Sequence, residues 1–221
     1  TDNSHYRLIE QAIQILENSA LNQIHTADHC EPQLAALAEQ LNVSSFYLQR
    51  LFTTWAGISP KQFFQSLQKD HARALLQTGH SILSTSLELG YKSTSKLHQL
   101  MLKFEALTPG EIKQLGEGQI FTIGHATSPF GETFICLTSK GINSLEFETD
   151  TLNFDTGRDN IQSLYPMAQL TKSNEKIKSI TTYTLKSIAG NEATVSVFSK
   201  KEGTQDVEAQ GMQMSINISA K

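Results

Sequence analysis

Two short stretches of this sequence carry polar side chains suited to hydrogen bonding with nucleotide bases. The first stretch offers Ser45, Phe46, Gln49 and Arg50, and the second offers Thr94, Ser95, Lys96, His98 and Gln99. Glutamine pairs bidentately with adenine, and arginine pairs bidentately with guanine. The alternative is that these side chains are ordinary solvated helix residues. The chemistry that they indicate is recognition of base edges rather than the making or breaking of a bond.

The first stretch is predicted to open the second helix of a helix–turn–helix unit. The apolar residues of Gln33–Asn42 recur at three- and four-residue steps, which predicts a short amphipathic helix. Ser44 follows the turn and is placed to cap the next helix by accepting an N–H group of its first turn. That helix is predicted to bury Leu48, Leu51, Phe52 and Trp55. A tight turn followed by a helix with a polar, exposed start is the geometry that reads the major groove.

A second unit with the same layout follows. Ser81 is placed to cap its first helix, Gly90 turns the chain, and its second helix is predicted over Ser93–Phe104. Thr108 and Pro109 are placed to start a last short helix. This near-repeat favours DNA binding, because two units with one layout are harder to explain as generic helical packing.

One long helix, predicted from Pro60 to Gly79, joins the two units. Ser59 is placed to cap it, and Pro60 occupies the first helical position, where its missing N–H group costs nothing. Its roughly 20 residues span about 30 Å, close to the roughly 34 Å between successive turns of one DNA groove. One chain could therefore place two helices in adjacent groove segments without dimerising. His71 and Arg73 of this helix either reach phosphates or are solvated.

Charge is distributed unevenly along the chain. The whole sequence has 18 Lys and Arg against 22 Asp and Glu, a net charge of −4. Residues 1–115 hold nine basic and ten acidic residues (net −1), residues 116–171 hold two and seven (net −5), and residues 172–221 hold seven and five (net +2). A nucleic-acid-binding domain is usually strongly basic, but the helical part of this chain is nearly neutral. DNA binding must then depend on where individual charges lie.

Composition bounds the class of protein. A hydrophobic content of 38% and a charged fraction of 18% are typical of a globular chain. No apolar run approaches about 18 residues, so no membrane span is predicted. With only two cysteines, Cys30 and Cys136, a reducing cytoplasm is the expected location. His25, His29 and Cys30 lie close together without further ligands nearby, so loop histidines are expected rather than a metal site, and no cofactor is predicted.

Six short motifs carry a family resemblance: Ala38–Ser44, Leu48–Phe52, Gly57–Pro60, Ala72–Leu76, Leu89–Tyr91 and Leu107–Glu111. Together they make residues 31–113 resemble the DNA-binding domain of the AraC family of bacterial regulators, which has two helix–turn–helix units bridged by a long helix. The resemblance implies double-stranded DNA as the partner, and RNA polymerase is a candidate second partner.

The resemblance also implies roles for single residues. Bases would be read by Phe46, Gln49 and Arg50 in the first unit and by Thr94, Ser95, His98 and Gln99 in the second. Phosphates would be contacted by Lys61, Lys92, Lys96 and Lys103, together with helix N-termini. The second unit departs from the family, because Leu97 and His98 replace a common aromatic-x-Arg pattern and Gln99 stands where arginine is frequent. Base reading is therefore better supported for the first unit.

From Gly116 the helical period stops and strands are predicted. The segments Ile120–Gly124, Thr133–Thr138 and Asn143–Phe147 alternate or cluster like strands. Followed by a helix over Asn160–Ala168, they resemble the N-terminal subdomain of the O6-alkylguanine-DNA alkyltransferases. An AraC-type unit followed by this subdomain is the layout of Ada-type adaptive-response proteins.

The resemblance does not extend to the reaction. That family transfers an alkyl group from guanine O6 to the cysteine of a Pro-Cys-His-Arg motif, and this sequence lacks the motif. Cys136 lies in an apolar strand context, which favours a buried and inert thiol. No catalytic residue is predicted, and enzyme activity is not expected in this chain.

Residues 172–221 match neither family. Ile180–Ile188, Ala193–Ser199 and Gly211–Ile218 are predicted strands, with Gly190 and Asn191 as a hairpin turn. This tail is either a divergent module or a segment of foreign origin.

The predicted fold class is α+β, with an all-α N-terminal domain and a small β-rich C-terminal domain. The predicted domains are a leading helix and linker (1–30), a double helix–turn–helix domain (31–115), an alkyltransferase-like subdomain (116–171) and a strand tail (172–221). The predicted function is that of a sequence-specific DNA-binding transcriptional regulator. The alternatives are a methylated-DNA–cysteine S-methyltransferase whose catalytic half is missing, and a β-rich interaction module with a helical passenger.

Overall fold

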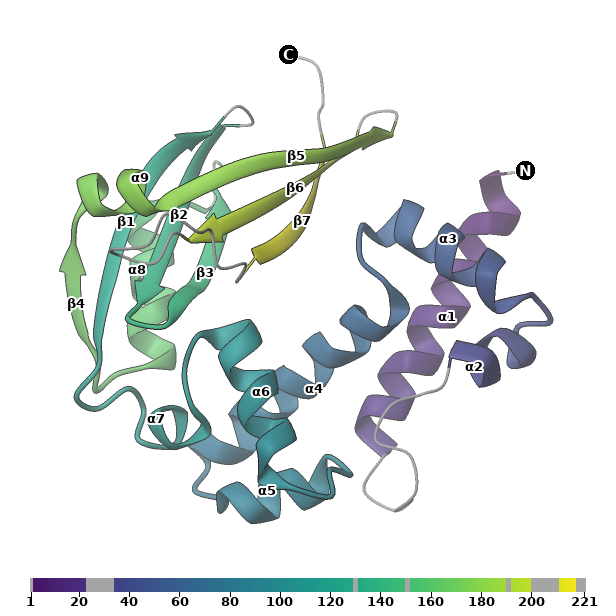
Figure 1. Ribbon diagram of the computed structural model, residues 1–221, viewed down its shortest axis with the longest axis horizontal. Coiled ribbons are helices and arrows are strands. Elements are labelled where there is room, and N and C mark those ends of the chain that lie inside the picture. The colour runs from purple at the N-terminus through teal and green to yellow at the C-terminus, as the bar shows by residue number, and fades with distance from the viewer. Residues whose placement is uncertain are drawn as a thin grey trace.

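The computed structural model describes residues 2–22, 34–128, 131–149, 152–189, 192–199 and 211–217. The helices α1–α7 come first along the chain, and the strands follow with α8 and α9 among them (Figure 1). The helices are α1 (Asp2–Asn22), α2 (Leu34–Gln40), α3 (Ser45–Ala56), α4 (Pro60–Gln77), α5 (Ile82–Glu88), α6 (Thr94–Glu105), α7 (Pro109–Lys113), α8 (Phe154–Leu164) and α9 (Asn174–Ile180). The strands are β1 (Ile120–Ser128), β2 (Gly131–Thr138), β3 (Gly141–Phe147), β4 (Gln169–Lys172), β5 (Thr181–Ala189), β6 (Glu192–Ser199) and β7 (Gly211–Asn217). The mixed helix-and-sheet class is confirmed, and the predicted division into domains stays a prediction.

Helices start where polar caps predict them. The hydroxyls of Ser44, Ser59, Ser81 and Thr108 each accept an N–H group from the first turn of the helix that follows. At α4 and α7 the contact is reciprocal, which makes a capping box. The linker helix α4 ends at Gln77 rather than at Gly79 as predicted. Gly79 has a φ of 97°, a left-handed conformation that stops a right-handed helix.

The first hydrophobic core lies between α1, α2, α3 and the start of α4. Its buried members include Ala12, Leu16, Leu37, Leu48, Phe52 and Phe64. The leading helix predicted within residues 1–30 is α1, and its apolar stripe covers the first helix–turn–helix unit.

The second hydrophobic core joins the second helix–turn–helix unit to the sheet. It combines Ala72 and Leu76 of α4 and Leu97 and Met101 of α6 with Phe121, Phe134 and Tyr165 from beyond residue 115. The helix α4 contributes Phe64 to the first core and Leu76 to the second. The core thus continues across the predicted boundary at residue 115.

A four-stranded sheet follows the helices, with the strand order β3-β2-β1-β4. β2 is antiparallel to both β1 and β3, and β4 runs parallel to β1. α8 packs on the face that carries Phe134, and a Cβ at Gly157 of α8 would lie 2.7 Å from that ring. α9 packs on the other face, where a Cβ at Gly124 would lie 2.9 Å from Ile177. The close approach of both helices requires these glycines.

Two predicted elements need correction after β3. The helix expected over Asn160–Ala168 is α8, which starts earlier because Asn153 caps it and ends at Leu164. Tyr165 precedes Pro166 and leaves the helical conformation, with φ −132° and ψ 68°, as residues before proline usually do. The tail was expected to hold strands alone, but α9 precedes them. The three predicted strands are confirmed as β5, β6 and β7 of one antiparallel sheet.

Candidate nucleic-acid interface

Helix α3 carries the first candidate surface. Its buried side holds Leu48, Leu51 and Phe52 against the first core. Phe46 is 79% exposed, and Gln49 and Arg50 are also exposed. Their three- and four-residue spacing places these side chains on one face of the helix. The structure therefore gathers the three predicted residues at the open start of α3.

Trp55 was predicted to be buried on α3, and this prediction is wrong. Its side chain is 38% exposed. Its ring lies edge-on to that of Tyr6 in α1, with 6.3 Å between ring centroids. An indole is large enough to pack one side against a neighbouring helix while the other side faces solvent.

Helix α6 carries the second candidate surface, which is more covered than the first. Leu97, Leu100 and Met101 are buried in the second core. Ser95 and Gln99 are exposed, whereas Thr94 and His98 are only half-exposed. All four lie in the first two turns, at the helix end that enters a groove in this class of motif. The structure therefore brings them together, with two of the four side chains partly covered.

The four predicted phosphate-binding lysines are all exposed, but their surroundings differ. Lys61 lies in the first turn of α4, Lys92 lies in the turn between α5 and α6, and Lys96 lies in the first turn of α6. Lys103 donates a hydrogen bond of 2.9 Å to the side-chain oxygen of Gln65, and its ammonium lies 4.9 Å from the centre of the Phe104 ring. Lys103 would have to give up these contacts to reach a phosphate.

The two surfaces lie at opposite ends of one helix. α3 immediately precedes the start of α4 in the chain, α5 follows the end of α4, and both α5 and α6 pack against α4 (Figure 1). The 18 residues of α4 extend about 27 Å at about 1.5 Å per residue. This length suits two recognition helices in successive turns of one major groove, about 34 Å apart.

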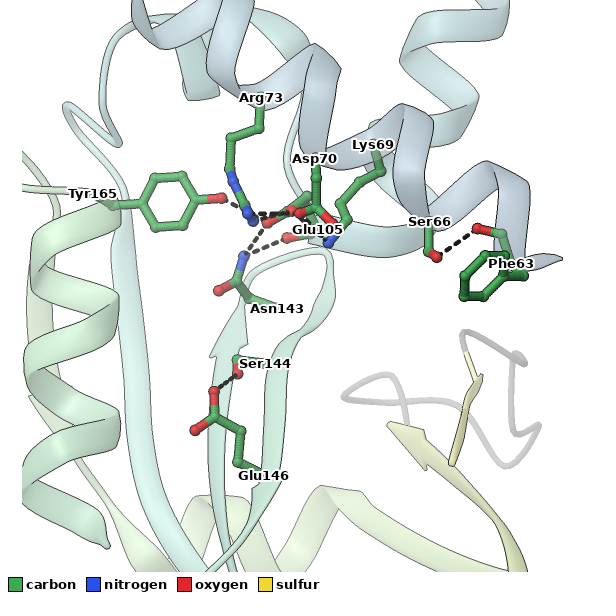
Figure 2. A network of polar contacts seen from close by, with 10 residues as sticks. All are labelled: Phe63, Ser66, Lys69, Asp70, Arg73, Glu105, Asn143, Ser144, Glu146 and Tyr165. Atoms are coloured by element: carbon green, nitrogen blue, oxygen red, sulfur yellow. Dashed lines mark hydrogen bonds and ion pairs between the residues drawn. The ribbon is translucent and has the colours of Figure 1, made fainter. Parts of the chain in front are cut away.

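A buried carboxylate lies at the far end of α6. Glu105 is 3% exposed, and its Oε1 accepts a hydrogen bond of 2.6 Å from Arg73 of α4. Its Oε2 accepts a bond of 2.7 Å from the Tyr165 hydroxyl, and its main-chain oxygen accepts one of 2.7 Å from the Asn143 amide. Figure 2 shows these side chains converging on Glu105 from α4, β3 and the end of α8. We call Glu105, Arg73, Asn143 and Tyr165 the Glu105 clamp.

Electrostatics favour the charged form of Arg73 and the neutral form of Tyr165. Burial works against the charge on Arg73, but the carboxylates of Glu105 and Asp70 outweigh it and raise the pKa of Arg73 above the ordinary value. Burial and the Glu105 charge together raise the pKa of Tyr165, which therefore stays a neutral donor. Lys69 adds a further cation, with Nζ 3.6 Å from Glu105 Oε1.

The clamp corrects one expectation and shows what sequence reasoning missed. Arg73 was expected either to reach phosphates or to be solvated, but it pairs with Glu105 and with Asp70 at 2.7 Å. Sequence analysis singled out neither Glu105 nor Tyr165. The two lie 60 positions apart, so no local periodicity connects them. A glutamate among the buried positions of α6 was the available indication, because a buried charge requires a partner.

Glu111, the carboxylate of the α7 capping box, joins α7 to the turn between β2 and β3. Burial opposes ionisation of Glu111, but hydrogen bonds from Lys140 and Thr108 outweigh burial and hold the pKa of its carboxyl below the ordinary value. Lys140 Nζ lies 2.6 Å from Glu111 Oε1.

The described residues offer little for covalent or metal chemistry. Cys136 is buried, and burial, with a smaller contribution from Glu105, raises the pKa of its thiol. No group of three or more metal-binding side chains occurs within the described ranges. The predicted loop of His25, His29 and Cys30 lies outside the residues that the structure describes. No described helix is long and apolar enough to cross a membrane.

Residues 37–114 match the model of the helix-turn-helix domain family. This range contains α3, α4, α5 and α6, and hence every residue predicted to contact DNA. The helix-turn-helix assignment made from the motifs is confirmed.

Curated relatives are similar over parts of their length. The bifunctional transcriptional activator/DNA repair enzyme Ada of Escherichia coli is 24% identical over 135 residues, which are 61% of this chain and 37% of that protein. The HTH-type transcriptional regulator CdhR of Pseudomonas aeruginosa is 41% identical over 70 residues, 30% of this chain and 21% of CdhR. The melibiose operon regulatory protein of Escherichia coli is 27% identical over 82 residues, 37% of this chain and 27% of that protein. The chain thus spans well under half the length of each of these relatives.

Solved structures resemble about half of the chain. The C-terminal domain of AraT, a response regulator from Geobacillus stearothermophilus, is 22% identical, with a TM-score of 0.42 over 48% of this chain and 83% of its own. A probable AraC family transcriptional regulator from Rhodopseudomonas palustris is 18% identical, with a TM-score of 0.42 over 50% of this chain and 97% of its own.

Proposed function

We propose that this protein is a sequence-specific DNA-binding transcriptional regulator. The observation that carries the proposal is the pair of helix–turn–helix units at the two ends of α4, each with a polar helix start open to solvent. The helix-turn-helix model matches this same range, and the similar curated proteins are named as a transcriptional activator and DNA repair enzyme, a transcriptional regulator and an operon regulatory protein.

In this proposal α3 and α6 enter successive segments of one major groove. Phe46, Gln49 and Arg50 read the first half of the site, with the glutamine suited to adenine and the arginine to guanine. Thr94, Ser95, His98 and Gln99 read the second half. Lys61, Lys92 and Lys96 contact phosphates and set the register, and Lys103 joins them if its bond to Gln65 opens.

Two experiments test the proposal. The full chain is first used to select duplexes from a random-sequence library, and its affinity for the selected duplex is then measured by gel-shift titration. Wild-type protein should bind the selected duplex more tightly than random DNA. Arg50→Ala should lose about 1–3 kcal/mol of binding free energy on the selected duplex, the range for one bidentate base contact. The same variant should bind random DNA almost as wild type does.

The matched control is Arg158→Ala, because Arg158 is an exposed arginine on α8, away from both recognition helices. It should leave both titrations unchanged. If Arg50→Ala weakens binding to selected and random DNA equally, Arg50 is a phosphate contact rather than a base contact. If the library yields no preferred sequence, the proposed function is wrong.

The proposal extends to partners and location. Two recognition helices in one chain allow binding as a monomer, which sedimentation of the protein–DNA complex would measure as one chain per duplex. RNA polymerase is the proposed second partner, and a cytoplasmic location accompanies a regulator of this kind. Retention of purified RNA polymerase on the selected duplex only when this protein is present would support that contact.

We also propose that β1–β3 and α8 form an alkyltransferase-like subdomain without catalytic activity. The order of a strand meander followed by a helix supports the likeness. Cys136, the thiol within this unit, is buried and its pKa is raised, which makes it a poor nucleophile. Incubation with duplex DNA containing O6-methylguanine should leave Cys136 without a methyl adduct by mass spectrometry. A stoichiometric adduct would mean that the chain is an alkyltransferase instead.

A further inference from the structure

The two recognition helices are anchored to different parts of the molecule. α3 packs in the first core, whose described members come from α1, α2, α3, α4 and their connections. α6 packs in the second core, which also contains Phe121, Phe134 and Tyr165 of the sheet unit. Among the described residues, the sheet unit, here β1–β4 with α8, shares its core with the second helix–turn–helix unit rather than with the first.

The Glu105 clamp is the polar part of that contact. Glu105 is the last residue of α6, and two of its hydrogen bonds come from the sheet unit, through the Tyr165 hydroxyl and the Asn143 amide. A third comes from Arg73 of α4. The carboxylate thus ties the end of α6 to the linker helix and to Tyr165, and the main-chain oxygen of Glu105 ties it to Asn143 of β3 (Figure 2). Hydrogen bonds have preferred directions, so these partners define where α6 ends in a way that apolar packing alone does not.

We propose that Tyr165 and Asn143 are positioning residues for DNA recognition. They hold α6 in place through Glu105, so that the sheet unit influences how α6 reads the second half of the DNA site. The proposal rests on the DNA-binding function proposed above. It assigns the sheet unit a role in specificity without any contact to DNA. A change in the sheet unit would then alter recognition by α6 and leave recognition by α3 unchanged.

Tyr165→Phe tests the proposal with the smallest change. It removes the hydroxyl that bonds to Glu105 and keeps the ring, which packs edge-on against Phe121 with centroids 5.2 Å apart. The matched control is Thr133→Val, which also removes one buried hydroxyl from the sheet unit. That hydroxyl donates to the Ala126 main-chain oxygen at 2.7 Å, not to Glu105.

The first readout is discrimination at each half of a duplex selected by the wild-type chain. Affinity is measured for the intact duplex and for duplexes with either half scrambled. Tyr165→Phe should reduce discrimination at the half read by α6 about fivefold or more, and leave discrimination at the half read by α3 unchanged. Thr133→Val should retain both. Equal losses at both halves, or equal effects of the two variants, would overturn the proposal.

The second readout needs no DNA. Amide hydrogen exchange should become at least several-fold faster over residues 94–105 in Tyr165→Phe than in Thr133→Val, while residues 45–56 exchange as in the wild type. Unchanged exchange over residues 94–105 would refute the positioning role even if the chain binds DNA. Failure of the wild-type chain to select any sequence would instead refute the proposed function, and the exchange experiment would still decide whether the clamp holds α6.

Discussion

Replacing Glu105 by glutamine should reveal how strongly the clamp stabilises the fold. The glutamine has the same shape but carries one acceptor oxygen and no charge. If that oxygen keeps the bond to Arg73, the amide NH2 group faces the Tyr165 hydroxyl, which must then accept instead of donate. The cations of Arg73 and Lys69 also lose their most buried counter-charge.

The expected cost follows from the geometry. Removing one partner of a fully buried ion pair costs about 3–5 kcal/mol, because the other charge stays buried. Here Arg73 retains Asp70 at 2.7 Å, and the side chains of Arg73 and Lys69 are 20% and 18% exposed. Both features reduce the penalty. We expect Glu105→Gln to lower the free energy of unfolding by about 2–3 kcal/mol.

Urea unfolding followed by circular dichroism provides the measurement. Asp155→Asn is the matched control, because it neutralises a carboxylate whose side chain is 75% exposed and that pairs with Arg158 at 3.3 Å. The loss of an exposed, solvent-screened pair of this kind should change stability far less than the loss of the buried Glu105 carboxylate. Adding Arg73→Met to Glu105→Gln should recover part of the loss, since both charges are then absent. A cost for Glu105→Gln no larger than that of the control would refute the reasoning.

Three further changes test other parts of the structure. Gly157→Ala should lower the free energy of unfolding by about 1–3 kcal/mol, because the added Cβ would lie 2.7 Å from the Phe134 ring. This loss is expected although alanine usually favours a helix. Greater stability of the variant in urea would show that α8 packs differently. The lowered pKa of Glu111 means that its contribution to stability is present above its unfolded pKa of about 4.3 and is lost as the pH falls through its folded pKa. Lys140→Met should therefore flatten the loss of stability below about pH 5 in unfolding curves measured across pH, and an unchanged slope would contradict the assigned pair. Ser59→Ala should cost about 1 kcal/mol by removing the cap of α4, and Ser59→Asn, which can still cap, should restore most of it in the same assay.

The helix starts and the exposed face of the first candidate surface could be predicted because their causes are local. A cap such as Ser44 accepts an N–H group from a residue three positions ahead, so the pattern is visible in a window of a few residues. The apolar stripe of α3 likewise specifies which side is buried, and it leaves Gln49 and Arg50 on the open side. The predicted end of α4 was wrong because a single residue, Gly79, adopts a left-handed backbone conformation that the local pattern does not reveal.

The surroundings of the second recognition surface could not be predicted in this way. The lysine predicted to contact phosphate at position 103 is bonded to Gln65, which lies 38 positions away on α4. Arg73 was read as a surface cation because sequence neighbours alone do not show that α6 ends beside it. Such contacts depend on how the helices cross, which is set by packing between elements and not by local pattern.

The sequence alone therefore determined the two helix–turn–helix units, the start of the helix between them and the polar face of α3. Each of these depends on residues within about four positions of one another. Only the tertiary structure decided that the second unit shares a core with the sheet and that Glu105 is bonded to both Arg73 and Tyr165. The physical reason is that a buried carboxylate must find donors wherever the folded chain brings them, here 32 positions before it and 60 positions after it.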